Sequence, residues 1–154
     1  MISEDLTTMK TASHAAPADF RSRPITGHVA QDYLGLYRDD PPDYKRIAEL
    51  VQLSKADLSK LAGVAKSSVR FDANIPVPVA ERLREIANIA NLVAEFFGGD
   101  ARKVGLWFEL PNPMLGSISP RNMIRAGRYK RLFSFVLDAR EAEVAALQKT
   151  QATG

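Results

Sequence analysis

Apolar residues recur at helical spacing along most of the chain, and the longest such pattern lies at residues 79–97. There the apolar positions follow one another at steps of three and four, which places them on one face of a helix. Ile89 and Leu92 widen that face, so we expect this helix to be central in the fold. Gly98 and Gly99 follow it and are expected to end it.

Further helical patterns flank this segment, and no run reads convincingly as a strand. Residues 71–79 alternate apolar side chains, but two prolines favour an extended connector. Residues 1–26 show no apolar period and are expected to form a mobile tail. The sequence therefore predicts an all-α fold, with additional helices at 44–52, 54–62, 100–110, 119–126 and 128–148 and a short one at 27–37.

Composition limits the class of protein. The chain has 154 residues, 45% of them hydrophobic and 25% charged, which suits one ordinary domain or two small lobes. The absence of cysteine excludes disulfides, thiolate zinc sites and thiol catalysis. No stretch approaches the roughly 18 consecutive apolar residues of a membrane span, and the first residues lack the pattern of a secretory signal. We therefore expect a cytoplasmic protein.

Few residues offer catalytic chemistry. His14 lies in the expected tail, and His28 has no acid or ligand partner nearby in the sequence. The adjacent Asp39 and Asp40 stand in a predicted turn, and the FFGGD stretch is typical of a helix end rather than of a phosphate-binding loop. We expect the protein not to be an enzyme and to need no metal or other cofactor.

Residues 54–71 have the pattern of a helix-turn-helix. Ser54 is a good N-cap, and Asp57 three residues later completes a capping box. Gly63 permits a left-handed turn, after which KSSVRF is expected to begin a second short helix. The small Ser59 lets two helices cross steeply. Such a corner also occurs as packing alone, so the pattern leaves both interpretations open.

The outward face of the second helix favours DNA, because its side chains are short or basic donors suited to phosphates and base edges. Two lysines of the first helix add possible phosphate contacts. One copy should bind weakly, which implies a dimer or a larger assembly. The candidate DNA-binding residues are Lys55, Lys60, Lys66, Ser67, Ser68 and Arg70.

Residues 106–127, LWFELPNPMLGSISPRNMIRAG, combine rigid turn residues with the start of a basic run. They hold the only tryptophan, three of the nine prolines and two of the nine glycines. Residues 120–131 then carry five basic side chains and no acid. Helical spacing places Arg121, Arg125 and Arg128 near one another, where their repulsion would be relieved by an acidic partner surface. A solvated face and an auxiliary phosphate contact are the alternatives.

The chain resembles the C-terminal toxin-binding domain of Xre/MbcA/ParS-type antitoxins in an ordered set of features: Trp107, the PNPMLG turn (111–116), Ser119-Pro120, Gly127 and the apolar helix that follows. The match covers roughly residues 80–140, and with the upstream helix-turn-helix at 44–71 it covers most of the chain. It departs from the family at Ser117-Ile118, where relatives often carry a second glycine.

The resemblance implies a role in a type II toxin–antitoxin system. The partner would be a RES-domain toxin that degrades NAD or transfers ADP-ribose, and the antitoxin would bind over its active-site cleft. The N-terminal domain would bind the operon's own promoter. On this basis the candidate toxin-binding residues are Ser119, Arg121, Arg125, Arg128, Lys130 and Arg131. The residues expected to shape the turn are Trp107, Pro111, Pro113, Leu115, Gly116, Pro120 and Gly127.

The expected organisation is a tail at 1–26, a helix-turn-helix domain at 27–72 and a C-terminal toxin-binding domain at 73–150. A homodimer or a larger complex with the toxin is expected. The alternative function is a helix-turn-helix DNA-binding regulator or adaptor whose C-terminal domain only oligomerises.

Overall fold

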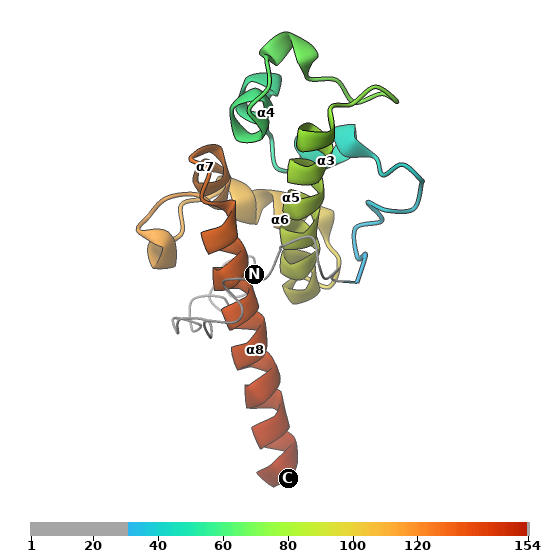
Figure 1. Ribbon diagram of the computed structural model, residues 1–154. Helices are drawn as coiled ribbons and strands as arrows, with labels where there is room; N and C mark the ends of the chain where they lie inside the picture. The colour runs from blue at the N-terminus through green and yellow to red at the C-terminus, as the bar shows by residue number, and fades with distance from the viewer. Residues whose placement is uncertain (1–30, 154) are drawn as a thin grey trace.

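The computed structural model describes residues 31–153, and this part of the chain folds into six α-helices without a strand. The prediction of an all-α fold is confirmed. In Figure 1 α3 and α4 lie at one end of α5, and α7 lies beside the start of α8. The helices are α3 (Tyr44–Leu50), α4 (Lys55–Ala62), α5 (Val77–Phe96), α6 (Ala101–Glu109), α7 (Pro120–Arg125) and α8 (Tyr129–Thr153).

The α5 helix is the centre of the molecule, as the apolar pattern predicts. It begins at Val77, two residues before the predicted start, because Pro78 falls in the first turn, where a missing N–H costs no hydrogen bond. A continuous run of residues from Glu85 to Ala94 is buried. The α3, α4, α6 and α8 helices all pack on it. Because α5 is covered on several sides, a single hydrophobic cluster includes residues from both sides of the predicted boundary at 72/73.

Short polar side chains begin several of the helices, and the capping box predicted at Ser54 is confirmed. Ser54 and Asp57 form the reciprocal capping box of α4, and Gly63 ends that helix with φ of +68°. Asp100 accepts hydrogen bonds from the first amides of α6. Ser119 caps α7, with Pro120 in its first turn.

The prediction of a short helix at 27–37 is wrong for residues 31–37, the part of that range that the structure describes. Residues 31–37 form turns instead. The Asp32 carboxylate accepts hydrogen bonds from the amides of Leu36 and Tyr37 at 2.8 and 2.9 Å. Asn91 of α5, fully buried, accepts one from the Leu34 amide at 3.1 Å. These side-chain acceptors compete with helical hydrogen bonding and fix a loop. Residues 1–30, which include the expected tail and both histidines, lie outside the described residues.

The prediction of a second helix in the helix-turn-helix is also wrong. It is a single 3-10 turn, η3 (Lys66–Ser68). Val69 follows in an extended conformation and its side chain is buried. The backbone therefore stops turning at Val69, where the side chain enters the core. Arg70 then pairs with Asp72 at 2.7 Å. The segment therefore offers an exposed turn where a recognition helix was expected.

The α8 helix runs well past the rest of the fold, as Figure 1 shows. Its first half packs on α5 and α7 and buries Leu132, Val136 and Ala139. Its second half leaves Val144 and Leu147 exposed. Within residues 31–153, no helix combines the length and the apolar character required to cross a membrane.

Candidate functional site

The turn at residues 110–118 is built around Asn112, which is buried. Its side-chain oxygen accepts a hydrogen bond from the Met114 amide at 2.9 Å, and its backbone carbonyl accepts from Leu115 and Ser117 at 2.9 and 3.0 Å. Its amide donates to the Ile118 carbonyl at 3.1 Å and closes the turn. Asn112 is thus the organising residue of the turn. Asparagine is a common turn former, and the sequence places Asn112 between the two prolines expected to make this turn rigid.

Two consecutive residues of this turn are left-handed. Gly116 has φ of +73°, and no atom would meet a Cβ placed there within 4 Å. Ser117 has φ of +62° despite carrying a side chain. A left-handed residue other than glycine is strained.

Trp107 anchors the turn in the core. It is 1% exposed and meets Phe108 edge to face, with ring centroids 5.1 Å apart. Leu115 packs against the same cluster from the single 3-10 turn η4 (Pro113–Leu115), and Pro120 is buried where α7 begins. Pro111, Pro113 and Gly116 are exposed, and Gly127 turns the chain between α7 and α8 with φ of +77°.

The turn exposes three large apolar side chains. Leu110 is 39% exposed, and Met114 and Ile118 are each 38% exposed. Figure 1 shows the segment projecting away from the helices, joined to them through α6 and α7. Exposed apolar side chains on a rigid turn are candidates for contact with a partner protein. The sequence pattern alone does not separate these exposed apolar side chains from the buried Trp107 and Phe108 of the same segment.

Ser119 is a structural residue of this fold. It is 5% exposed, and its hydroxyl oxygen accepts a hydrogen bond from the Asn122 amide at 3.1 Å. A buried side chain that is occupied as a helix cap is not available to a partner. The Ser119 hydroxyl is therefore engaged as the N-cap of α7, and its role as a toxin contact stays a prediction.

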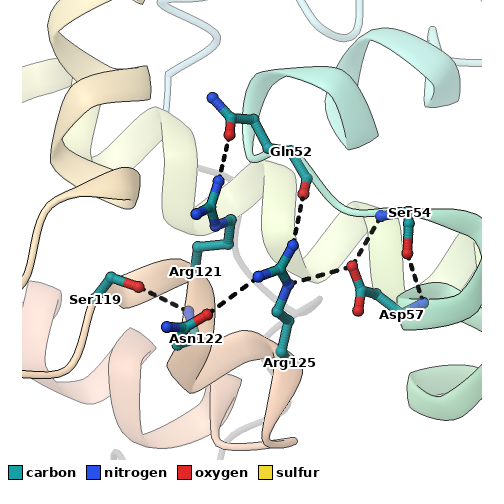
Figure 2. A network of polar contacts seen from close by, with 7 residues as sticks. All are labelled: Gln52, Ser54, Asp57, Ser119, Arg121, Asn122 and Arg125. Atoms are coloured by element: carbon teal, nitrogen blue, oxygen red, sulfur yellow. Dashed lines mark hydrogen bonds and ion pairs between the residues drawn. The ribbon is translucent and has the colours of Figure 1, made fainter.

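Arg121 and Arg125 point from α7 toward the start of α4 (Figure 2). Arg125 Nε donates to Asp57 Oδ2 at 3.2 Å, and its Nη1 donates to the Asn122 side chain at 3.2 Å. Arg121 donates to the side-chain oxygen of Gln52. The expected repulsion among the arginines is relieved within the chain at Arg125, which pairs with the Asp57 carboxylate, whereas Arg121 contacts only the neutral Gln52 amide.

The Asp57 carboxylate both completes the capping box of α4 and pairs with Arg125 of α7. Partial burial raises its pKa, but the hydrogen bonds from Ser54 and the charge and hydrogen bond of Arg125 outweigh burial and hold the pKa below 3.8. One oxygen, Oδ2, accepts both the Ser54 amide at 2.9 Å and Arg125. The capping box of α4 is therefore also the docking point of α7.

The remaining basic residues of the run have a different environment. Arg128, Lys130 and Arg131 are exposed. Among the residues that the structure describes, none of the three forms an ion pair or a side-chain hydrogen bond. These cations stand at the junction of α7 and α8 and remain available to an acidic partner.

The expected DNA-binding residues form an exposed but loosely organised group. Lys55 and Lys60 are exposed on α4, and Lys66, Ser67 and Ser68 are exposed on η3. Arg70 is exposed and engaged with Asp72 through both Nε and Nη2, at 3.0 and 2.7 Å. Short hydroxyls on a single turn cannot enter a groove as a helix does, so this surface suits phosphate contacts better than base contacts.

Residues 31–153 contain no cluster of three or more histidine, aspartate or glutamate side chains able to hold a metal ion. No protein-family model matches the chain, and no curated protein or solved structure is detectably similar to it.

Proposed function

We propose that the chain is an antitoxin of a type II toxin–antitoxin system that binds a RES-domain toxin, one that degrades NAD or transfers ADP-ribose, and covers its active-site cleft. The proposal starts from the resemblance of residues 80–140 to Xre/MbcA/ParS-type antitoxins. The observation that carries it is the turn at 110–118, a rigid segment that exposes apolar side chains and leads through α7 to three available cations.

The turn is suited to binding because its shape is fixed before a partner arrives. Asn112 accepts hydrogen bonds from three backbone amides through its side-chain oxygen and its carbonyl. The turn therefore has little conformational entropy left to lose when it binds a partner. Leu110, Met114 and Ile118 supply apolar area. Apolar anchors on a rigid support are typical of the energetic centre of an interface.

The cations would give the interface its charge complementarity. Arg128, Lys130 and Arg131 are the candidates, since Arg121 and Arg125 already contact the start of α4. Arginine pairs with carboxylates through two parallel hydrogen bonds, and long-range attraction raises the association rate. An acidic rim around the toxin cleft would meet these requirements.

Autoregulation through promoter DNA is the second part of the proposal. The exposed Lys55, Lys60 and Lys66 could neutralise phosphates, which favours affinity without much sequence discrimination. Specific binding from a single 3-10 turn would be weak, so two copies or a complex with toxin would be required for a defined operator.

The alternative is a DNA-binding regulator or adaptor whose C-terminal domain only oligomerises. One observation favours it: the second half of α8 leaves Val144 and Leu147 exposed along a helix that extends beyond the core. A second helix covering this side would form a dimer without any toxin.

The experiment that separates the two is binding of the purified chain to the product of the adjacent gene, which the antitoxin proposal predicts to be a RES-domain protein, measured by calorimetry. The antitoxin proposal predicts saturable binding that is at least tenfold weaker for Met114→Asp and for Arg128→Glu/Arg131→Glu. The matched control is Arg38→Glu/Arg102→Glu, which reverses two exposed cations elsewhere and should bind normally. Absence of binding by the unmodified chain would contradict the proposal.

A further inference from the structure

The second half of α8 lies outside the core of the described residues. Every residue at positions 143–152 is exposed, and Figure 1 shows this α8 extension running beyond the other helices. It nevertheless carries two large apolar side chains, Val144 and Leu147, which are 44% and 59% exposed. An isolated helical segment of this length is marginally stable in water, so a covering surface would stabilise the extension.

The two exposed side chains continue an apolar stripe that is covered nearer the core. Phe133 and Leu137 begin the stripe and are only 9% and 7% exposed. The residues of the stripe follow one another at alternating steps of four and three, which places them on one face of α8. They are Phe133, Leu137, Arg140, Val144 and Leu147. The stripe is therefore continuous from the core into the extension, whereas its apolar cover is not.

An apolar pocket of about 100 Å³ lies beside the covered part of the stripe. Leu92 of α5 and Phe133 and Leu137 of α8 supply its apolar lining. Tyr33, which is 37% exposed, and the ion pair of Glu95 with Arg140 line it as well, so the pocket reaches the surface. A cavity of roughly 150 Å³ holds a benzene ring, so this smaller pocket has room for one aliphatic side chain.

An antiparallel second copy of α8 would bring an exposed side chain to this pocket. In a pair related by a two-fold axis each contact occurs twice, so a surface that carries both a pocket and a matching side chain can cover itself. Leu147 of one copy lies opposite Leu137 of the other when the axis passes Ala142, midway between them. A parallel pair would place Leu147 opposite Leu147 and leave the pocket empty.

The charges give nearly the same register independently. Arg140 lies in the stripe, and the exposed Glu143 follows three positions later on the adjoining edge of the helix. The two lie opposite each other across an antiparallel pair when the axis passes between Glu141 and Ala142. Within the described residues Arg140 pairs through Nε alone, with Glu95 Oε2 at 2.6 Å. Its two Nη groups can therefore donate to the Glu143 carboxylate of a second copy.

We propose that a second copy of this chain covers the α8 extension in an antiparallel pair. Leu147 of each copy enters the pocket beside Leu137 of the other, and Glu143 of each pairs with Arg140 of the other. Because the contact is short, it belongs with small, transient interfaces, and the fraction of dimer should depend on concentration. The pair uses neither the turn at 110–118 nor the exposed lysines of the DNA surface, so it is independent of the antitoxin function.

Sedimentation of the full chain at increasing concentration tests the association. The unmodified chain should pass from monomer to dimer, and Leu147→Asp should weaken the dimer by about tenfold or more, because a carboxylate would enter an apolar pocket. The matched control is Ala146→Asp, an equally exposed position of the extension outside the stripe, which should dimerise normally. Circular dichroism should show the helix content of the unmodified chain in both variants, since both positions are exposed.

Cross-linking tests the register, because the unmodified chain has no cysteine. Leu137→Cys/Leu147→Cys should form a disulfide-linked dimer under mild oxidation, and Leu147→Cys alone should not. A cross-linked dimer of the single variant would indicate a parallel pair and overturn the proposal. An unmodified chain that stays monomeric up to about 1 mM, or a folded Leu147→Asp variant that dimerises normally, would also overturn it. A monomeric chain that binds the product of the adjacent gene less well after Leu147→Asp would assign the face to that protein instead.

Discussion

Arg125 Nε lies 3.2 Å from Asp57 Oδ2, so a residue of α7 contacts the capping box of α4 across 68 positions of sequence. The contact joins the segment expected to bind DNA to the segment expected to bind toxin. Figure 2 shows that Gln52 extends it, since Arg121 and Arg125 both reach this residue. The two candidate surfaces are thus parts of one connected structure.

The first prediction concerns the strength of this contact. The Arg125 and Asp57 side chains are 38% and 20% exposed, so solvent screens the pair in part. A double-mutant cycle with Arg125→Ala and Asp57→Asn, measured by urea unfolding, should give a coupling free energy of about 0.5–1 kcal/mol. Asp57→Asn alone should cost more than Arg125→Ala, because it also weakens the cap of α4. A coupling indistinguishable from zero would mean that the contact does not hold α7 to α4.

The second prediction concerns acid. The pKa of Asp57 is lower in the folded chain than its ordinary value of 3.8, so the charged form is favoured by folding. The stability that follows is fully present above the unfolded pKa and is lost as the pH falls through the folded pKa. The difference in unfolding free energy between the unmodified chain and Asp57→Asn should be constant above about pH 5 and shrink below pH 4. A difference that stays constant down to pH 2 would contradict this role.

The third prediction concerns the strained turn. Ser117→Gly should raise the free energy of unfolding by about 0.5–1 kcal/mol, because glycine adopts a positive φ without strain. Gly116→Ala should lower it by about 1 kcal/mol, although there is open space for the added methyl group. Thermal unfolding of the two variants should therefore shift in opposite directions. Equal shifts for both would show that side-chain contacts, not backbone conformation, decide the stability of this turn.

The fourth prediction concerns DNA. If Lys55, Lys60 and Lys66 contact phosphates, each alanine substitution should reduce the slope of log affinity against log salt by about 0.9. Arg70→Ala should have a smaller effect, because Arg70 is held by Asp72. Gel shifts with the promoter at several salt concentrations measure both, and Arg102→Ala on α6 is the control. An unchanged slope in the triple lysine variant would contradict phosphate binding by this surface.

The helices and their caps could be predicted because they depend on neighbours in sequence. Ser54 with Asp57, Ser119 with Pro120 and the apolar stripe of α5 each carry a local signal, and the structure confirms them. The loop at 31–37 could not be predicted in this way. Its shape depends on Asn91, which lies 57 positions from Leu34 and reads as an ordinary helical residue.

The candidate sites were harder to predict than the helices. The basic run at 120–131 is visible in the sequence, but its division into paired Arg121 and Arg125 and available Arg128, Lys130 and Arg131 depends on where α7 packs. The expected recognition helix failed for a related reason. Burial of Val69 accompanies the extended backbone conformation after η3, and no pattern in the neighbouring sequence predicts that burial.

The most direct test of the antitoxin proposal is growth of cells that express the product of the adjacent gene, which the proposal predicts to be a RES-domain toxin, together with this chain. The unmodified chain should restore growth, and so should Arg38→Glu/Arg102→Glu. Arg128→Glu/Lys130→Glu/Arg131→Glu should remain folded and fail to restore growth. Arrested growth with the unmodified chain at matched expression would contradict the proposed function. Full protection by the folded triple variant would instead contradict the place assigned to the toxin contact.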